Sequence, residues 1–240
     1  MRRRSSIAAT LLSLVVAVSC SGGSDEERVV GSAPQSTEAV SGDVATTDSP
    51  TTTVAPLSNA SNSAIAAIAE FDDAELARSL GAINESALAD PDTLRAEALV
   101  GLSAAEPNRR FASVLALTMT ASTEYPPSIE ALRKLSTSPD VTERLLAAGA
   151  LAALGEKNGV DVLIDALVSE ELLRNVDPPF AAWRYSRANL LLFIDQDLGL
   201  ADARDAAATA AAQPAWMAWW AAHAAELTWN AELGRYEAPA

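Results

Sequence analysis

The sequence predicts an all-α fold built as an α-solenoid of antiparallel helix pairs. Hydrophobic residues make up 49% of the 240 residues, and many of them are alanine, the residue with the highest helix propensity. From about residue 62 onward, apolar residues recur at helical spacing. Similar segments also return along the chain, beginning at Arg110, Arg144 and Arg184. A unit of one helix pair buries its apolar face only by stacking on its neighbours, so these observations favour a row of stacked pairs.

The first 20 residues, MRRRSSIAATLLSLVVAVSC, have the parts of a secretory signal. A positive segment, Arg2 to Arg4, precedes an apolar segment that runs from Ile7 to Val18. The apolar segment is too short to remain in a bilayer as a permanent spanning helix. We therefore expect residues 1–20 to be a signal peptide and the protein to be exported.

Cys20 is the one cysteine of the chain, and it stands where the signal is expected to be cut. This arrangement resembles the lipobox of bacterial lipoproteins, although Ala17 takes the place where that family usually has leucine. The resemblance implies that Cys20 carries a palmitate-type lipid and holds the protein on the extracytoplasmic side of the cell membrane. The alternative is cleavage by an ordinary signal peptidase, with Cys20 incidental.

Residues 21–60 are rich in Ser, Thr, Gly, Pro and acids, and they lack the leucine and aromatic content that offsets ordering entropy. We predict a disordered tether there, and about 40 flexible residues reach on the order of 35 Å. Residues 61–240 form the predicted helical repeat domain.

The first predicted helix, from about residue 62, places Ala64, Ile65, Ile68, Phe71 and Leu76 on one face. Each later helix is predicted from a proline or a capping residue followed by an apolar stripe. The predicted starts are Asp90-Pro91, Pro107, Pro126-Pro127, Ser138-Pro139, Pro178-Pro179 and Pro214. The stripes include Leu94, Ala98, Leu99 and Leu102, then Phe111, Val114, Leu115 and Leu117, then Ile129, Leu132 and Leu135, and later Trp183, Leu190 and Ile194.

Residues 138–168 give the clearest helix pair. Ser138 is the expected N-cap and Pro139 the first helical residue, with acids in the first turn that complement the helix dipole. We expect Gly155 to end the first helix and Gly159 to end the turn. The second helix then packs back through its apolar positions, which are Val160, Leu163, Ile164 and Leu167.

The internal repeat is visible from the positions of arginine. The segment that begins at Arg110 aligns with the one at Arg144, and at a somewhat longer interval with the one at Arg184. Residues 139–168 resemble the HEAT-like repeats of the phycobilisome-lyase type, with an acid, an Arg, an Ala-Leu run ending in Leu-Gly and a second helix. Residues 106–136 and 180–212 match the pattern more loosely. The period also fits tetratricopeptide repeats, but their small-Gly-aromatic signature is missing.

The resemblance implies a right-handed superhelix that binds a partner on one face and has no chemistry of its own by default. It also implies that the recurring Arg and Asp residues pair between neighbouring units. For Asp140, Arg144 and Asp161 we therefore expect this structural role.

Charge and residue types exclude several functions. The net charge is −15, and residues 61–240 alone carry 26 acidic and 13 basic side chains, or −13. This surface repels nucleic acid, and it serves solubility or attracts a basic partner. His223 is the only histidine, so we expect no metal site and no cofactor, and we place His223 among packed residues of the last helix. Four acids, Asp195, Asp197, Asp202 and Asp205, are expected to be helix caps or solvated ends, with calcium as the alternative.

The predicted C-terminal helix holds four of the five tryptophans, which are Trp216, Trp219, Trp220 and Trp229. Trp216, Trp219, Trp220 and His223 stand at i, i+3, i+4 and i+7, so they share one face of a helix. We predict a Trp-rich helix that caps the last repeat. The alternative is an exposed aromatic groove, in which Trp216, Trp219 and Trp220 form a binding surface for a peptide or sugar.

These observations together predict a lipid-anchored scaffold in the cell envelope that holds a partner protein and is not an enzyme. The alternative hypothesis is an accessory subunit or enzyme of cell-envelope processing, which would need a polar cluster on the concave face. A third is a purely structural spacer.

Overall fold

The computed structural model describes residues 73–176 and 179–238. Within these ranges the protein is mostly helical, with eight α-helices, one 3-10 turn and a single short two-stranded sheet. The predicted all-α class is confirmed at this level. The predicted signal, Cys20, the tether and the stripe from Ala64 to Phe71 lie outside the described residues.

The helices follow one another with short connections. They are α3 (Asp73–Ala89), α4 (Pro91–Gly101), α5 (Pro107–Thr120), α6 (Pro126–Leu135), α7 (Val141–Ala153), α8 (Lys157–Asp165), the 3-10 turn η2 (Ala166–Val168), α9 (Ala182–Phe193) and α10 (Ala206–His223). Strands β1 (Thr228–Asn230) and β2 (Arg235–Glu237) close the described chain as an antiparallel hairpin in which Trp229 pairs with Tyr236.

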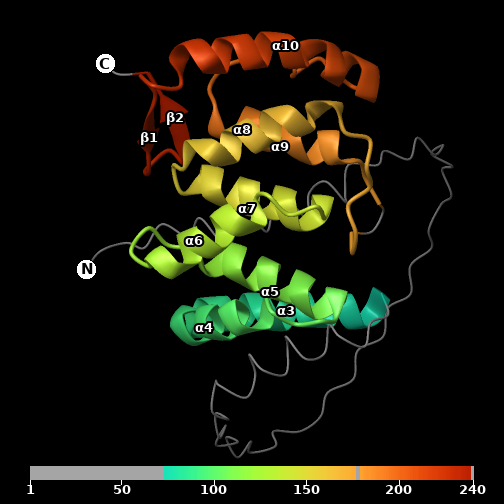
Figure 1. Ribbon diagram of the computed structural model, residues 1–240, viewed down its shortest axis with the longest axis vertical. Helices are drawn as coiled ribbons and strands as arrows, with labels where there is room; N and C mark the ends of the chain where they lie inside the picture. The colour runs from blue at the N-terminus through green and yellow to red at the C-terminus, as the bar shows by residue number, and fades with distance from the viewer. Residues whose placement is uncertain (1–72, 177–178, 239–240) are drawn as a thin grey trace, which may run out of the picture.

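The helices are layered in chain order, from α3 and α4 at one end of the molecule to α10 at the other (Figure 1). Helices next to each other in sequence pack together, as α4 does with α5 and α7 with α8. Helices two apart pack as well, so that α5 lies on α7 and α7 on α9. Helix α10 covers η2, α8 and α9. Packing is therefore dominated by neighbours in the sequence.

Helices α5 and α7 lie at the centre of the core. Every residue from Phe111 to Thr120 is buried, and in α7 every residue except Arg144 is buried. Small side chains such as Ala147 and Ala148 let the neighbouring helices approach closely. The buried residues form two clusters, and α7 contributes to both, through Leu145 on one side and Leu151 on the other.

Three of the six predicted helix starts are correct, since proline stands at the first position of α4, α5 and α6. The start predicted at Pro178-Pro179 is wrong, because α9 begins at Ala182. The N-cap of α7 was predicted wrongly. It is Asp140, whose carboxylate accepts from the Thr142 and Glu143 amides at 3.0 Å each, and not Ser138. The Asp carboxylate reaches these first-turn amides two and three positions further along the chain, so α7 begins at Val141.

Of the two glycines predicted to end elements of this helix pair, Gly155 and Gly159, one was interpreted correctly. Gly155 follows the C-cap of α7 with a φ of +82°, a left-handed conformation that glycine adopts without strain. Gly159, expected to end the turn, instead lies in the first turn of α8 and is buried. A Cβ there would lie 2.6 Å from the Ala152 amide nitrogen, so Gly159 allows α8 to cross the backbone of α7.

The C-terminal region differs from the prediction in two ways. Pro214 does not open a helix but lies inside α10, where alanines on both sides and packing against one surface keep the helix continuous. Just before it, the Gln213 side chain donates to the carbonyls of Ile164 and Asp165 at the end of α8. Residues after the helix form the β1–β2 hairpin, so Trp229 lies on a strand rather than on the helix.

Candidate functional site

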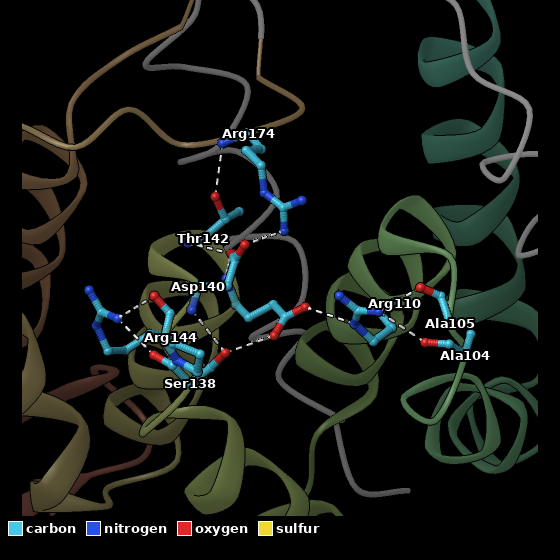
Figure 2. Close-up of polar contacts among 10 residues, drawn as sticks. Ala104, Ala105, Arg110, Ser138, Asp140, Thr142, Arg144 and Arg174 are labelled. Carbon is cyan, nitrogen blue, oxygen red and sulfur yellow. Dashed lines mark hydrogen bonds and ion pairs between the residues drawn. The ribbon is translucent and has the colours of Figure 1, made fainter.

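The loops that lead into α5 and α7 carry the internal repeat as a repeated contact (Figure 2). Arg110 donates through Nη1 to the carbonyls of Ala104 and Ala105, at 3.0 and 2.9 Å. Arg144 donates through Nη1 to the carbonyls of Ser138 and Pro139, at 2.7 and 3.3 Å. The two acceptors advance along the chain by the same interval as the two arginines. The predicted alignment of Arg110 with Arg144 is thus a structural repeat, in which a helix arginine holds the loop that precedes the helix.

Arg184, the third arginine of the sequence alignment, behaves differently. Its guanidinium lies over the Trp183 ring at 5.2 Å from the ring centroid, which is close enough for a cation–π contact. In α9 it is Arg187 that donates to loop carbonyls, those of Leu200 and Ala201, at 2.7 and 2.8 Å. Because Leu200 and Ala201 lie after α9, the third copy keeps neither the position of the arginine nor its contact with the preceding loop.

A polar contact joins the first two repeated units. Arg110 Nε donates to Glu143 Oε1 at 3.3 Å, which links α5 to α7. The other carboxylate oxygen of Glu143 accepts from Ser138 Oγ at 2.8 Å, and Ser138 Oγ accepts in turn from the Asp140 amide. Glu143 is buried, so a partner for its charge is needed there.

The ion pair of Asp140 is made with Arg174, in the long connection between η2 and α9. The Arg174 amide also donates to Thr142 Oγ1 at 2.8 Å, so this connection is fastened across the start of α7 (Figure 2). Asp140 and Arg144 do not pair with each other. The contact between units expected for them is instead made by Arg110 and Glu143.

The connection that carries Arg174 is an insertion relative to the interval between the first two units. Two backbone hydrogen bonds join its ends. The Leu173 amide donates to the Phe180 carbonyl at 3.0 Å, and the Ala182 amide donates to the Glu171 carbonyl at 2.8 Å. Leu173 and Phe180 are buried against Phe111 and Tyr185, around a cavity of about 20 Å³. A cavity of that size has room for about one water molecule. The surface beneath this connection is therefore filled by the chain itself.

The predicted tryptophan surface is largely buried. Trp216 is 0% and Trp220 5% exposed, and only Trp219 is partly open to solvent. The Trp220 indole donates to Asp161 Oδ1 at 2.6 Å, so Asp161 fastens α10 to α8 rather than pairing with an arginine. The interpretation of Trp216 and Trp220 as an exposed groove is therefore wrong.

Further rings extend this cluster toward the hairpin. Tyr236 makes edge contacts with Trp220 and Trp229, at centroid distances of 5.8 and 5.0 Å. Trp229 also lies directly over Gly155, where a Cβ would be 2.8 Å from the Trp229 side chain. His223 is exposed and stacks on Trp219 at 5.1 Å, so its predicted packed position was wrong.

Of the four acids beyond α9, three serve as caps or in ion pairs, and Asp202 is exposed to solvent. Asp197 accepts from the Gly199 and Ala201 amides, and Asp205 is the N-cap of α10. Asp195 pairs with Arg235 of the hairpin at 3.0 Å. In residues 73–176 and 179–238, no three His, Cys, Asp or Glu side chains are grouped closely enough to hold a metal ion.

The shifted titrations have local causes. Burial, followed by the nearby carboxylates Glu156 and Asp161, raises the pKa of Tyr236 above its usual value. Burial also raises the pKa of Tyr185, whose hydroxyl faces Gly149 on α7. Both tyrosines therefore stay neutral and act as packing residues. Burial likewise raises the pKa of Glu97, and the charge of Asp90 adds to that effect.

Comparison with protein-family models, with curated proteins and with solved structures finds no match for this chain. In the part of the chain with described coordinates, none of the helices has the length and apolar character needed to cross a membrane.

Two residues that make contacts between elements, Glu143 and Arg174, were not predicted from the sequence pattern. Glu143 was assigned only to the helix dipole, yet its buried place in the first turn of α7 required a cation from the neighbouring unit. Arg174 gave no signal in the sequence, because it lies in a connection that breaks the repeat.

Proposed function

We propose that the chain is a lipid-anchored α-solenoid of HEAT-like helix pairs, closed by the Trp-rich helix α10, that holds a partner protein at the cell envelope without catalysing a reaction. The observation that carries the proposal is the repeated arginine contact, made by Arg110 and Arg144 at equivalent positions on successive layers. Sequence-local packing of helices α3 to α10 supports it as well.

Burial of Trp216 and Trp220 supports the capping role of α10. The end of a helix stack leaves apolar side chains open to water unless another element covers them. Here the indoles of Trp216 and Trp220 cover the apolar side chains of α8 and η2. The Trp220–Asp161 bond fixes the orientation of the cap.

The partner surface in this proposal is the side of the molecule that carries the connection between η2 and α9. Insertions in repeat proteins lie on one face, which is often the binding face. Two of the large hydrophobic side chains exposed to solvent lie at this connection, Val168 at 50% and Leu172 at 60%. A partner with apolar side chains flanked by basic ones suits this surface, because the domain carries −13.

The test compares two matched substitutions in the full chain expressed in its own envelope. Leu172→Asp places a charge on the proposed surface, and Leu233→Asp places the same charge on an exposed leucine of the hairpin loop, which is 58% exposed. After in-cell crosslinking and affinity purification, we expect partner proteins to be lost with Leu172→Asp and kept with Leu233→Asp. Equal recovery with both variants contradicts the assigned surface. No crosslinked protein from the unaltered chain contradicts the scaffold function.

The anchor has a separate test. Cys20→Ser is expected to abolish incorporation of labelled palmitate and to release the exported chain from the membrane fraction. Retention of the label in that variant contradicts lipidation at Cys20.

A further inference from the structure

The connection between η2 and α9 contains a segment that lies over the helix stack, residues 171–176 and Phe180, which we name the strap. Backbone hydrogen bonds join the two sides of the strap to each other. Arg174 fastens it to the start of α7, because its guanidinium pairs with Asp140 and its amide donates to Thr142 Oγ1 (Figure 2). The strap lengthens the interval of the internal repeat, so it is an addition to the stack of helix pairs.

The strap covers a surface to which three helices of the stack contribute. Its buried side chains, Leu173 and Phe180, line one cavity together with residues of α5, α7 and α9, which occupy equivalent places in the sequence repeat. These residues are Phe111 and Leu115 of α5, Thr142 and Leu146 of α7, and Tyr185 of α9. Solenoid proteins bind their partners on surfaces built from equivalent elements of successive repeats. The covered surface is therefore of the kind on which a solenoid holds a ligand.

The strap fits this surface imperfectly. Asn175 has a φ of +58° and is the one non-glycine residue in the described part of the chain with a positive φ. Asn175 Nδ2 and Arg174 Nε are buried with no hydrogen-bond partner among the described residues, and a cavity of about 20 Å³ remains beneath the strap. Release into water restores these hydrogen bonds and relaxes the backbone, so opening costs less free energy than the buried area alone implies.

We propose that the strap is an internal competitor, which occupies the binding groove of the solenoid and is displaced by a partner segment that carries an arginine beside a large apolar residue. This inference rests on the proposed function and deepens it, since it states what the surface next to Leu172 binds. The strap itself shows the chemistry of that partner segment. Its apolar side chains fill the space over the three helices, and its arginine pairs with Asp140.

Charge favours an arginine in the partner segment. Residues 61–240 carry −13, and within the described ranges Arg174 is the one cation that pairs with Asp140. When the strap leaves, Asp140 Oδ1 still caps α7, but the other carboxylate oxygen loses its ion pair. An arginine of the partner segment restores this pair. Val168 and Leu172, which are exposed beside the strap, offer the first apolar contact.

One variant provides both states of the strap. The Arg174 amide nitrogen lies 2.8 Å from Thr142 Oγ1, which places the two Cα atoms within about 7 Å of each other, the reach of a disulfide. In a mature Cys20→Ser chain, Thr142→Cys combined with Arg174→Cys removes both fastenings of the strap when the cysteines are reduced. Oxidation of the same protein locks the strap in place. Circular dichroism in both redox states checks that the fold is kept.

The probe is a fluorescent peptide with the sequence of residues 172–180, and its binding is measured by fluorescence anisotropy. Chain concentrations extend to about 1 mM, the range of effective concentration for a segment on a short linker. We expect the reduced chain to bind the peptide at least about tenfold more tightly than the oxidised chain, because the apparent affinity scales with the fraction of open strap. A control peptide with Arg174→Glu is expected to bind the reduced chain at least about fivefold more weakly, since its carboxylate meets Asp140.

Three outcomes of this experiment would each overturn the proposal. They are equal binding in the two redox states, no binding up to the highest chain concentration, and equal binding of the two peptides.

Hydrogen exchange of the unaltered chain tests the opening without a substitution. The amides of Leu173 and Arg174 report on the strap, and the amide of Leu151 in α7 reports on the core. We expect the strap amides to exchange at least about tenfold faster than Leu151, at a rate that low urea leaves unchanged, as in a local opening. Exchange at the Leu151 rate with the same dependence on urea would show that the strap leaves only on global unfolding, and this would overturn the proposal.

The two proposals fail separately. The peptide and exchange measurements use the purified chain, whereas capture of a partner protein through Leu172 is measured in the envelope. A strap that stays closed while capture is normal overturns only the internal competitor. Loss of capture by the unaltered chain while the strap opens overturns only the scaffold function.

Discussion

The crossing of α7 and α8 gives the sharpest prediction, through the substitution Gly159→Ala. The added Cβ would lie 2.6 Å from the Ala152 amide nitrogen and 2.9 Å from Leu151 Cβ, and closer still to the Ala148 carbonyl oxygen. These are atoms of the α7 backbone or fixed directly to it, so they cannot move aside as a flexible side chain would. The two helices must therefore separate.

The magnitude follows from two opposing effects. Alanine gains up to about 1 kcal/mol over glycine in helix propensity. Overpacking of a close contact costs about 1–3 kcal/mol, and here backbone atoms are involved, which favours the upper part of that range. We expect Gly159→Ala to lower the free energy of unfolding by about 1–2 kcal/mol. For a domain of this size that corresponds to a fall in Tm of roughly 2–8 °C.

The assay is urea unfolding of the full chain followed by circular dichroism at the helix signal. Gly81→Ala is the control, because Gly81 lies in α3 and a Cβ there would meet nothing within 4 Å. We expect that variant to be more stable by about 0.5–1 kcal/mol. If Gly159→Ala proved as stable as Gly81→Ala, α8 could not cross α7 at this residue and the reasoning would be refuted.

Three further predictions concern single contacts. Arg144→Ala removes the donors that hold the loop before α7, and we expect the free energy of unfolding in urea to fall by about 1 kcal/mol. The control is Lys134→Ala, at an exposed position of α6. A fall no larger than that of the control would contradict the repeated contact. Trp220→Phe removes the indole bond to Asp161, and we expect a loss of about 2 kcal/mol, whereas an unchanged midpoint would show that this bond does not hold α10. Hydrogen bonds from Thr93 at the start of α4 keep the pKa of Asp90 in the folded protein below its usual 3.8. The ionised carboxylate therefore stabilises the fold above pH 3.8. This stabilisation is lost as the pH falls through the lower pKa of the folded state. Acid unfolding of Asp90→Asn should therefore depend less steeply on pH in that range, and an identical acid transition would argue against the cap.

The starts of α4, α5 and α6 could be predicted from the sequence, because proline is suited to the first helical position. The N-cap of α7 could not, because Ser138 and Asp140 both satisfy the local rules. Asp140 is selected by contacts made outside the local pattern, the ion pair with Arg174 and the bond of Ser138 to Glu143. Local patterns carry no information about such partners.

The C-terminal region shows a second limit. A proline usually marks a helix start, but Pro214 lies inside α10. Packing of α10 on α8 and η2 outweighs the one backbone hydrogen bond that Pro214 cannot make. Helical spacing correctly placed Trp216, Trp219 and Trp220 on one helix. It could not tell whether their face was covered, because burial depends on where α8 ends and on the Asp161 carboxylate.

The layered arrangement of α3 to α10 is the central claim, and a distance between its two ends tests it most directly. Spin labels are placed at Ala96 of α4 and Ala218 of α10, both exposed, in a Cys20→Ser chain, and their separation is measured by pulsed electron resonance. Dilution with unlabelled chain keeps the measured distance internal to one molecule. Four helix-to-helix steps of about 8–10 Å predict a mean separation of about 30 Å or more. A mean below about 20 Å would show that the helices gather into one bundle and would contradict the account.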